Sequence, residues 1–329
     1  MTRAKSLLKV PVVLAALALL YLGLIAGFSN NPYYMQILNM AAINTIMAVS
    51  LNLINGFTGQ FSIGHAGFMG VGAYVAAVCS VFYKIPYLIA LFVGALAAAV
   101  VGLVVGIPTL RLKGDYLAIA TLGFAEIIRV IIVNIQKVGG PRGFLGIPPY
   151  TSFLWTYLFA VGTVIVISNF INSSPGRACL AVREDEVAAE SMGVNSTKYK
   201  VVAFVMGAFF AGLGGGLLVH LLSIAHPTMF TFLKSVDFLI MIVVGGQGSI
   251  TGSVTAASFI TVVSEALRKF EVWRMLAYSL VLIVVMLTRP QGLLGGKELT
   301  WEGIVNVPGR LRRFRLPKVG GGRVGTAGH

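Results

Sequence analysis

Glycine and polar residues alternate through residues 50–74, SLNLINGFTGQFSIGHAGFMGVGAY, although the flanking sequence is strongly apolar. The amide, hydroxyl and imidazole groups of this segment can hydrogen-bond to a polar molecule. Lipid cannot satisfy the backbone groups that a glycine-broken helix frees, so such a segment must be buried in protein or line a water-filled path. In transporters, interrupted apolar segments indicate where the solute passes. The predicted path residues of this segment are Asn52, Gly56, Gly59, Gln60, Ser62, His65 and Gly67.

A second glycine-broken segment, GGQGSITG, occupies residues 245–252. It shares the order Gly-Gln-x-Ser-Ile with residues 59–63. Two similar interruptions, one in each half of the chain, predict a duplicated architecture with the path between the halves. The alternative is a chance similarity, because glycine and serine are common in this chain. The predicted path residues here are Gly246, Gln247, Ser249 and Gly252.

The longest polar insertion, residues 174–200, reads SPGRACLAVREDEVAAESMGVNSTKYK. Residues 184–192 are rich in helix formers, with acidic residues in the first turn, where they complement the helix dipole. Gly193 stands where a C′ glycine belongs, and Asn195 or Ser196 can cap the next helix. A short helix with small alanines flanked by charge is a suitable shape for a groove in another protein. The alternative is a solvated connecting loop. The predicted contact residues are Arg183, Glu184, Asp185, Glu186, Ala188, Ala189, Glu190 and Gly193.

The elements that must position these segments are apolar helices. Hydrophobic residues make up 57% of the 329 residues and charged residues 11%, with a mean hydropathy of +0.88. A soluble chain has about 25% charged residues, so the composition predicts an all-α integral membrane protein. At roughly 20 apolar residues per span, we expect about ten (eight to ten) transmembrane helices. The predicted spans are 10–28, 33–53, 66–82, 87–107, 116–135, 152–171, 201–222, 235–247, 252–267 and 275–289.

The distribution of basic residues predicts how the chain is oriented in the membrane. The net charge is +14, and lysine and arginine concentrate in the segments that are cytoplasmic if both termini are inside. Anionic lipid therefore explains the basic excess, and nucleic acid is not needed as a partner. We predict a permease domain over residues 1–289, with the insertion 174–200 on the cytoplasmic side. The Gly-rich basic tail 290–329 is predicted to be a disordered cytoplasmic segment.

Two features of the topology stay open. The basic start and apolar run of residues 1–30 favour an uncleaved first span over a cleaved signal peptide, because no clean cleavage site follows. Span 235–247 is too short to cross unaided, and merging it with 252–267 would give nine crossings. Nine crossings would place the basic tail outside, so ten are preferred.

The motifs together resemble a known family. The stretches NLINGFTGQFSIGHAGFMGVGAY, GRACLAVREDEVAAESMGVNSTKYKVVAFVMGAFFAGLGGGL and GGQGSITGSV are similar to the permease subunits of branched-chain amino acid ABC importers, of the LivM type. The resemblance runs from about residue 35 to 295. It implies a type II-like importer permease in the cytoplasmic (inner) membrane that pairs with a LivH-type permease. Two cytoplasmic ATPases and an external solute-binding protein would complete such an importer.

The resemblance also implies a role for the insertion. Glu186, Ala188, Ala189 and Gly193 match the core of the EAA-type motif through which such permeases couple to their ATPases. The leading Glu-Ala-Ala is Glu-Val-Ala-Ala here, so the alanine that contacts the ATPase is not fixed by the match. The chain has no G-x-x-x-x-G-K-[ST] phosphate loop. ATP is therefore expected on partner subunits, with no cofactor on this chain.

Other function classes remain as alternatives. A secondary transporter would more often bury ionisable residues mid-span; Glu126 and Arg129 do lie in one, but their spacing allows a structural ion pair. A membrane-embedded enzyme or a metal site would need convergent nucleophiles, bases or ligands, whereas the histidines and cysteines are scattered. His65 either lines the path or makes a backbone hydrogen bond that fixes the broken helix. The expected solute is a branched-chain amino acid, with other amino acids, urea or short amides as alternatives.

Overall fold

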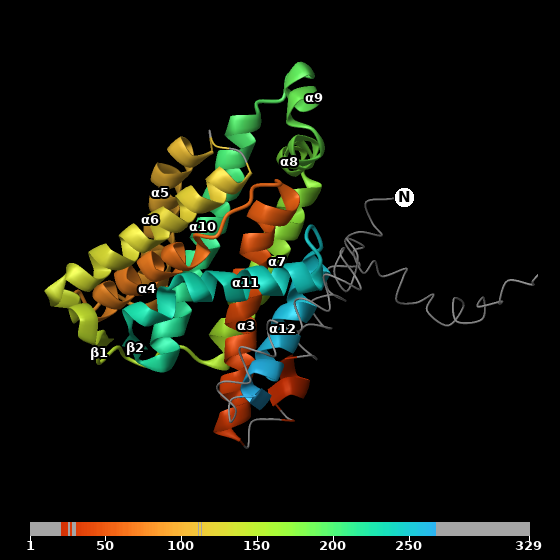
Figure 1. Ribbon diagram of the computed structural model, residues 1–329. Coiled ribbons are helices and arrows are strands. Elements are labelled where there is room, and N and C mark those ends of the chain that lie inside the picture. The colour runs from red at the N-terminus through yellow and green to blue at the C-terminus, as the bar shows by residue number, and fades with distance from the viewer. Residues whose placement is uncertain (1–20, 26, 28–30, 111, 113, 268–329) are drawn as a thin grey trace, which may run out of the picture.

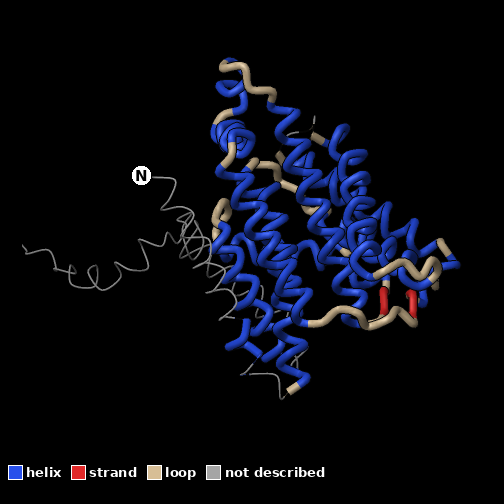
Figure 2. The backbone as a smooth tube through the Cα atoms, turned by 180° about the vertical axis from the view of Figure 1, so that it is seen from behind, coloured by secondary structure: helices blue, strands red, loops and turns tan. Residues whose placement is uncertain are grey.

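The computed structural model describes residues 21–25, 27, 31–110, 112 and 114–267, and nearly all of them lie in helices. Elements are numbered as labelled in Figure 1, beginning with α3 (Pro32–Asn52). Within the described residues, strands form one two-stranded sheet, β1 (Phe144–Leu145) with β2 (Ile224–Ala225), drawn red in Figure 2. The predicted spans 275–289 and most of 10–28, and the tail 290–329, lie outside the described residues.

Five helical segments of the described chain are long and apolar enough to cross a membrane. They are Pro32–Phe57, α5 (Tyr87–Thr109), α6 (Asp115–Asn134), α7 (Phe153–Asn172) and α10 (Ser196–Leu222). The shorter apolar helices are α4 (His65–Val81) and α12 (Ile250–Ala266), and α11 (Phe232–Gly245) precedes α12. The structure therefore shows a helical membrane protein with several spans. The predicted number of about ten spans stays a prediction, because parts of the chain lie outside the described residues.

Helix α10 forms the centre of the bundle, because its glycines let other backbones approach. A Cβ on Gly215 would lie 2.0 Å from the Met69 carbonyl oxygen of α4, and a Cβ on Gly72 of α4 would lie 2.2 Å from Gly212. Helix α5 packs on α10 and α4, while α3 packs against α12 and α7. Small residues at these crossings drive association where lipid removes the hydrophobic effect.

The two ends of the helical bundle carry different elements. Helices α8 (Ser174–Glu184) and α9 (Glu186–Ser191) project at one end, and β1 and β2 lie at the other (Figure 1). The short 3₁₀ turns η2 (Gln136–Val138), η3 (Gly140–Arg142) and η4 (Pro227–Phe230) belong to the loops beside the strands. Helix α11 runs across the bundle, inclined to α3 and α10, and α12 turns back from its end (Figure 1).

The insertion is two helices, whereas one helix over residues 184–192 was predicted. Ser173 caps α8, and α8 ends at Asp185, which has extended backbone angles. The Asp185 carboxylate accepts hydrogen bonds from the backbone N–H groups of Val187 and Ala188, at 2.9 and 3.0 Å. An aspartate that can cap in this way breaks the helical run, which explains the error. Gly193 takes a positive φ of 85°, as predicted for a C′ glycine, and Asn195 caps α10.

Candidate functional site

The two glycine-broken segments lie against each other at the end of α3, and one side chain joins them. The Asn52 amide donates to the Ser249 carbonyl at 2.9 Å and to the Ser253 hydroxyl at 2.8 Å. Its Oδ1 accepts from the Gly248 N–H at 2.9 Å. Asn52 thereby uses both donors and its acceptor to hold the turn between α11 and α12. We call this contact the α3–α12 joint: residues 52–57 together with residues 246–249.

Glycine is required at this joint by close approach. After Asn52 the helix widens into a π turn, η1 (Leu53–Phe57), a form that is frequent at functional sites. A Cβ on Gly56 would lie 1.8 Å from Asn52 Oδ1 and 2.4 Å from the Gly248 nitrogen. The second segment turns through Gly246 and Gly248, at φ angles of 107° and 81°, which L side chains rarely adopt.

Residues 58–64 form an extended connection between η1 and α4, and hydrogen bonds hold it to η1 and to α6. Asn55 and Ser62 bond twice, through the Asn55 amide to the Ser62 carbonyl and the Ser62 N–H to Asn55 Oδ1. The hydroxyl of Thr121 on α6 accepts from the Ile63 N–H at 3.2 Å. The hydroxyl of Ser235 on α11 accepts from the Ala66 N–H at 3.0 Å. Backbone freed by the break is thus satisfied by neighbouring helices, as membrane depth demands.

Three polar atoms in this connection and at the start of α4 have no partner. Within the described part of the chain, the buried side-chain atoms without a hydrogen bond are Gln60 Oε1, Ser62 Oγ and His65 Nδ1. All three residues fall within six positions of the sequence, and none is more than 2% exposed. A buried polar atom without a partner costs about 1–3 kcal/mol. Such a cluster is a site where water or a polar ligand would gain hydrogen bonds.

The remaining ring nitrogen of His65 is engaged. His65 Nε2 lies 2.9 Å from the hydroxyl of Ser50 on α3, and the ring packs edge-on to Phe238 of α11. The histidine therefore ties the start of α4 to α3 through a side chain. The sequence analysis gave a backbone hydrogen bond as one alternative for His65. In the structure the ring instead bonds to a side chain, the hydroxyl of Ser50.

The predicted path residues are brought together, but most of them are covered in this conformation. Gly59 and Gln247 are exposed. The buried ones are Asn52, Gly56, Gln60, Ser62, His65, Gly67, Gly246, Ser249 and Gly252. Gly67 packs against Ala125 of α6 rather than at the joint. A path through these residues would require the joint or the 58–64 connection to move.

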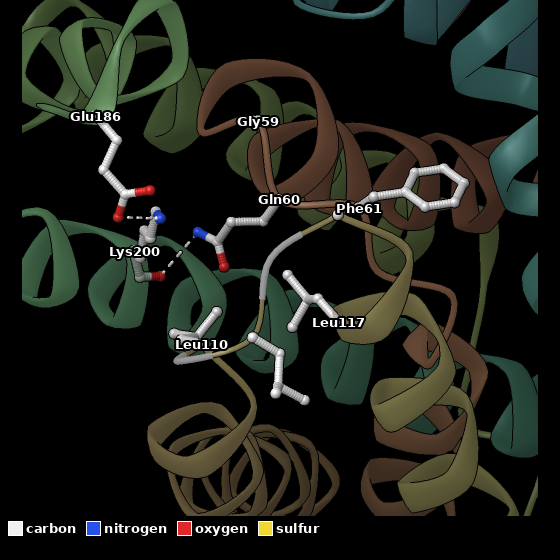
Figure 3. A pocket seen from close by; sticks show the side chains of 9 residues that line it. Gly59, Gln60, Phe61, Leu110, Leu117, Glu186 and Lys200 are labelled. Atoms are coloured by element: carbon white, nitrogen blue, oxygen red, sulfur yellow. Dashed lines mark hydrogen bonds and ion pairs between the residues drawn. The ribbon is translucent and has the colours of Figure 1, made fainter.

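A cavity of about 120 Å³ is lined by the 58–64 connection, by the segment from Leu110 to Leu117, and by Glu186 and Lys200 (Figure 3). Gln60 Nε2 donates to the Lys200 carbonyl at 3.2 Å, and Lys200 Nζ pairs with Glu186 of α9 at 2.6 Å. In Figure 3 the unpartnered Gln60 oxygen points into the space between Leu110 and Leu117. Lys200 is a site residue that the sequence interpretation missed, because nothing in the local pattern marks its ion pair with a residue on a separate helix.

The insertion presents an apolar surface on α9. Val187 is 69% exposed and Met192, at the C-cap, 84%, and Ala188 is also exposed. Ala189 is buried, at 6% exposure. The two alanines of the predicted contact motif therefore differ: Ala188 faces outward, and Ala189 faces inward.

The other predicted contact residues have varied surroundings. Glu190 accepts a hydrogen bond from the Ser196 hydroxyl, and Arg183 pairs with Glu184 at 3.1 Å. Arg183 also reaches the Gly56 carbonyl, a contact that the sequence interpretation did not foresee. Gly193 ends the insertion with open space around its Cα. The predicted Glu126–Arg129 ion pair on α6 is confirmed, at 2.6 Å.

A bundle of apolar helices with buried interruptions at one end and a projecting helical insertion is typical of a membrane permease subunit. Residues 33–288 match the family described as branched-chain amino acid transport system / permease component, and the chain belongs to this family. Its relatives are transporter subunits, not enzymes.

Individual relatives agree with the family. The chain is 33% identical over 313 residues to the high-affinity branched-chain amino acid transport system permease protein LivM of Salmonella typhimurium, covering 84% of this chain and 74% of that protein. It is 25% identical over 287 residues to LivH of Escherichia coli K12, covering 77% and 92%. It is 28% identical over 320 residues to the ribose import permease protein RbsC of Haemophilus influenzae, covering 86% and 94%. No solved structure matches the chain.

Proposed function

We propose that this chain is the permease subunit of an ABC importer that carries branched-chain amino acids across the cytoplasmic membrane. The family match and the similarity to LivM support the solute class. The similarity to LivH supports a second, related permease as the partner. In this proposal two cytoplasmic ATPases and an external solute-binding protein complete the importer, and both termini of this chain are cytoplasmic.

One observation carries the proposed path: the three unpartnered polar atoms of residues 60–65, inside a bundle of apolar helices. Their hydrogen-bonding capacity is unused in this structure. When the bundle opens, a zwitterionic solute or its accompanying water gains these bonds. The proposed path therefore runs along the 58–64 connection, towards the end of the bundle that carries the insertion.

The driving force in this proposal enters through α9. Its exposed apolar surface, with Val187, Ala188 and Met192, is suited to a groove on a partner ATPase. Closure of the ATPase dimer on ATP would move the docked helices, and the two permeases would rock about the path. The loops beside β1 and β2, at the opposite end, are then the surface available to the solute-binding protein.

The solute is open to direct comparison. The relative RbsC is a ribose import permease, so similar bundles serve chemically different solutes. Uptake of labelled leucine, ribose and urea into vesicles that contain the complete importer distinguishes these classes. Leucine uptake that exceeds the others supports the proposal, and uptake of urea or ribose alone overturns the assigned solute.

The coupling helix is tested by Ala188→Arg, which places a bulky charge on the exposed face of α9. We expect ATP-driven uptake to fall to background while the subunit stays in the membrane and elutes as one folded species. Ala188→Ser, which keeps the side chain small, is the matched control and retains uptake. Full uptake by Ala188→Arg would overturn the docking role. Accumulation against a gradient by the chain alone would make it a secondary transporter.

A further inference from the structure

Arg183 connects the insertion to the interrupted helix. It lies at the end of α8, two residues before the break at Asp185. Its Nη1 donates to the Gly56 carbonyl at 2.9 Å, across 127 positions of sequence. Gly56 belongs to the π turn, and a charged donor makes a stronger bond to such a carbonyl than a neutral donor does.

The Arg183 side chain also fits against glycines of both interrupted segments, with its aliphatic stem at Gly59 and its guanidinium at Gly248. A Cβ on Gly59 would lie 3.1 Å from Arg183 Cγ, and a Cβ on Gly248 would lie 2.7 Å from Arg183 Nη1. Side chains at these two positions would displace the arginine. The remaining partner is Glu184, whose carboxylate lies 3.1 Å from Nη2 and whose side chain is 73% exposed. An exposed pair of this kind holds the arginine only weakly.

Arg183 and Asn52 both lie against Gly56 and Gly248. Gly56 lies one helical turn after Asn52, and the Gly248 N–H bonds to Asn52 Oδ1. A displacement of Arg183 therefore acts on both sides of the α3–α12 joint at once. The Lys200 carbonyl, bonded to Gln60, gives the insertion a further contact with the 58–64 connection.

We infer that Arg183 is the positioning residue through which movement of the α8–α9 insertion reaches the α3–α12 joint. The inference rests on the proposed importer function, in which the ATPases move α9. Arg183 acts through the backbone of Gly56 and Gly248 and needs no contact with the solute. Removing its guanidinium should leave the insertion able to dock while the joint no longer follows it.

The test compares two arginines of the same helix in the complete, reconstituted importer. Arg183→Met keeps an unbranched side chain against Gly59 and removes the donor to Gly56. Arg177→Met is the matched control, because Arg177 lies on α8 but bonds to the Asn172 carbonyl, away from the joint. Arg183→Lys keeps the charge and one donor. For each complex the measurements are assembly with the ATPases, the ATP hydrolysis rate, and the solute taken up per ATP hydrolysed.

We expect Arg183→Met to assemble and to hydrolyse ATP at a rate similar to that of the wild type, because the Arg183 side chain lies at the joint and not on the exposed surface of α9. Its uptake per ATP should fall about tenfold, a loss in the range expected from one charge-assisted hydrogen bond. Arg183→Lys should recover part of this ratio, and Arg177→Met should keep the wild-type value.

Two results would overturn the inference. One is an unchanged uptake per ATP in Arg183→Met. The other is failure of Arg183→Met alone to assemble, which would make Arg183 a purely structural residue. Absence of ATP-driven uptake in the wild-type importer would instead contradict the proposed function.

Discussion

The two interrupted segments share the order Gly-Gln-x-Ser-Ile, yet the structure uses them differently. Ser249 caps α12 by accepting from the Gly252 N–H at 3.0 Å, whereas Ser62 Oγ has no partner. Gln247 is exposed, whereas Gln60 is 2% exposed with an unsatisfied oxygen. In the second segment, all of which the structure describes, no buried side-chain atom lacks a hydrogen bond, whereas the first segment has buried atoms without a partner. Similar motifs therefore need not have similar roles, and the proposed path belongs to the first segment.

The largest expected effect comes from closing the space at the joint. Gly56→Val puts side-chain atoms where a Cβ alone would already lie 1.8 Å from Asn52 Oδ1. We expect a destabilisation at or above the upper end of the ~1–3 kcal/mol that overpacking costs. Thermal denaturation in detergent measures it. Gly162→Ala on α7, with no atom within 4 Å of the added Cβ, is the control and should not destabilise.

The next effect comes from the residue that joins the segments. Asn52→Ala removes three hydrogen bonds, two of them buried, and leaves the half-buried Gly248 N–H without its acceptor. We expect a loss of about 1–3 kcal/mol, with a matching drop in denaturation midpoint. Asn39→Ala, in the first half of α3, removes bonds to Thr156 and to the Met35 carbonyl and is the comparison, because it lies away from the joint. Wild-type stability in Asn52→Ala would show that the joint does not hold the two segments.

Ser62 and Ser249 occupy the same place in the shared Gly-Gln-x-Ser-Ile order. Replacing each in turn separates an effect on stability from an effect on transport. Ser249→Ala loses a helix cap and should cost about 1 kcal/mol. Ser62→Ala removes a hydroxyl that has no partner, so stability should stay the same or rise. If the first segment lines the path, leucine uptake should fall more in Ser62→Ala than in Ser249→Ala. The opposite order in uptake would move the proposed path to the second segment.

Cysteine accessibility sharpens the same contrast. Gln247→Cys should react with a small polar thiol reagent at rest, because residue 247 is exposed. Gln60→Cys should react only while the importer turns over, when the 58–64 connection opens. Equal labelling of Gln60→Cys with and without ATP and solute would show that the connection does not open during transport.

The smallest expected effect is labelling of the two native cysteines, which sets the background of the cysteine-accessibility experiment. Cys79 and Cys179 are both buried. On α8, burial raises the pKa of the Cys179 thiol to about 11. The thiolate is the reactive form, so at pH 8 nearly all of this thiol is protonated and inert, and reactivity should grow only as the pH approaches 11. Rapid labelling of Cys179 at pH 8, with Cys79 replaced by Ala, would show that the insertion opens without its ATPases.

Much of the helical pattern could be predicted from sequence. Helices α3 to α7 begin and end within a few residues of the predicted spans, because long apolar runs and flanking prolines and glycines are local signals. The prediction missed the division of the insertion at Asp185. It missed it because the acidic run was interpreted as a first turn, although an aspartate that accepts two backbone N–H groups ends one helix and starts another.

The candidate site was predictable in position and not in geometry. Gln60, Ser62 and His65 were identified from their types and from the glycines around them. That they would be buried with unused atoms could not be inferred, because burial depends on which helices cover them. The outward face of Ala188 and the buried face of Ala189 were equally undetermined, since α9 is too short to show a periodic pattern.

The sequence by itself determined that the chain is a helical membrane protein with two glycine-broken segments and a polar insertion. Hydropathy, glycine and capping residues act over a few positions, so they can be interpreted one segment at a time. Only the tertiary structure decided that Asn52 meets Gly248, 196 positions away, and that Arg183 meets Gly56. Such contacts depend on how α3, α8, α11 and α12 pack together, and packing is a property of the whole bundle.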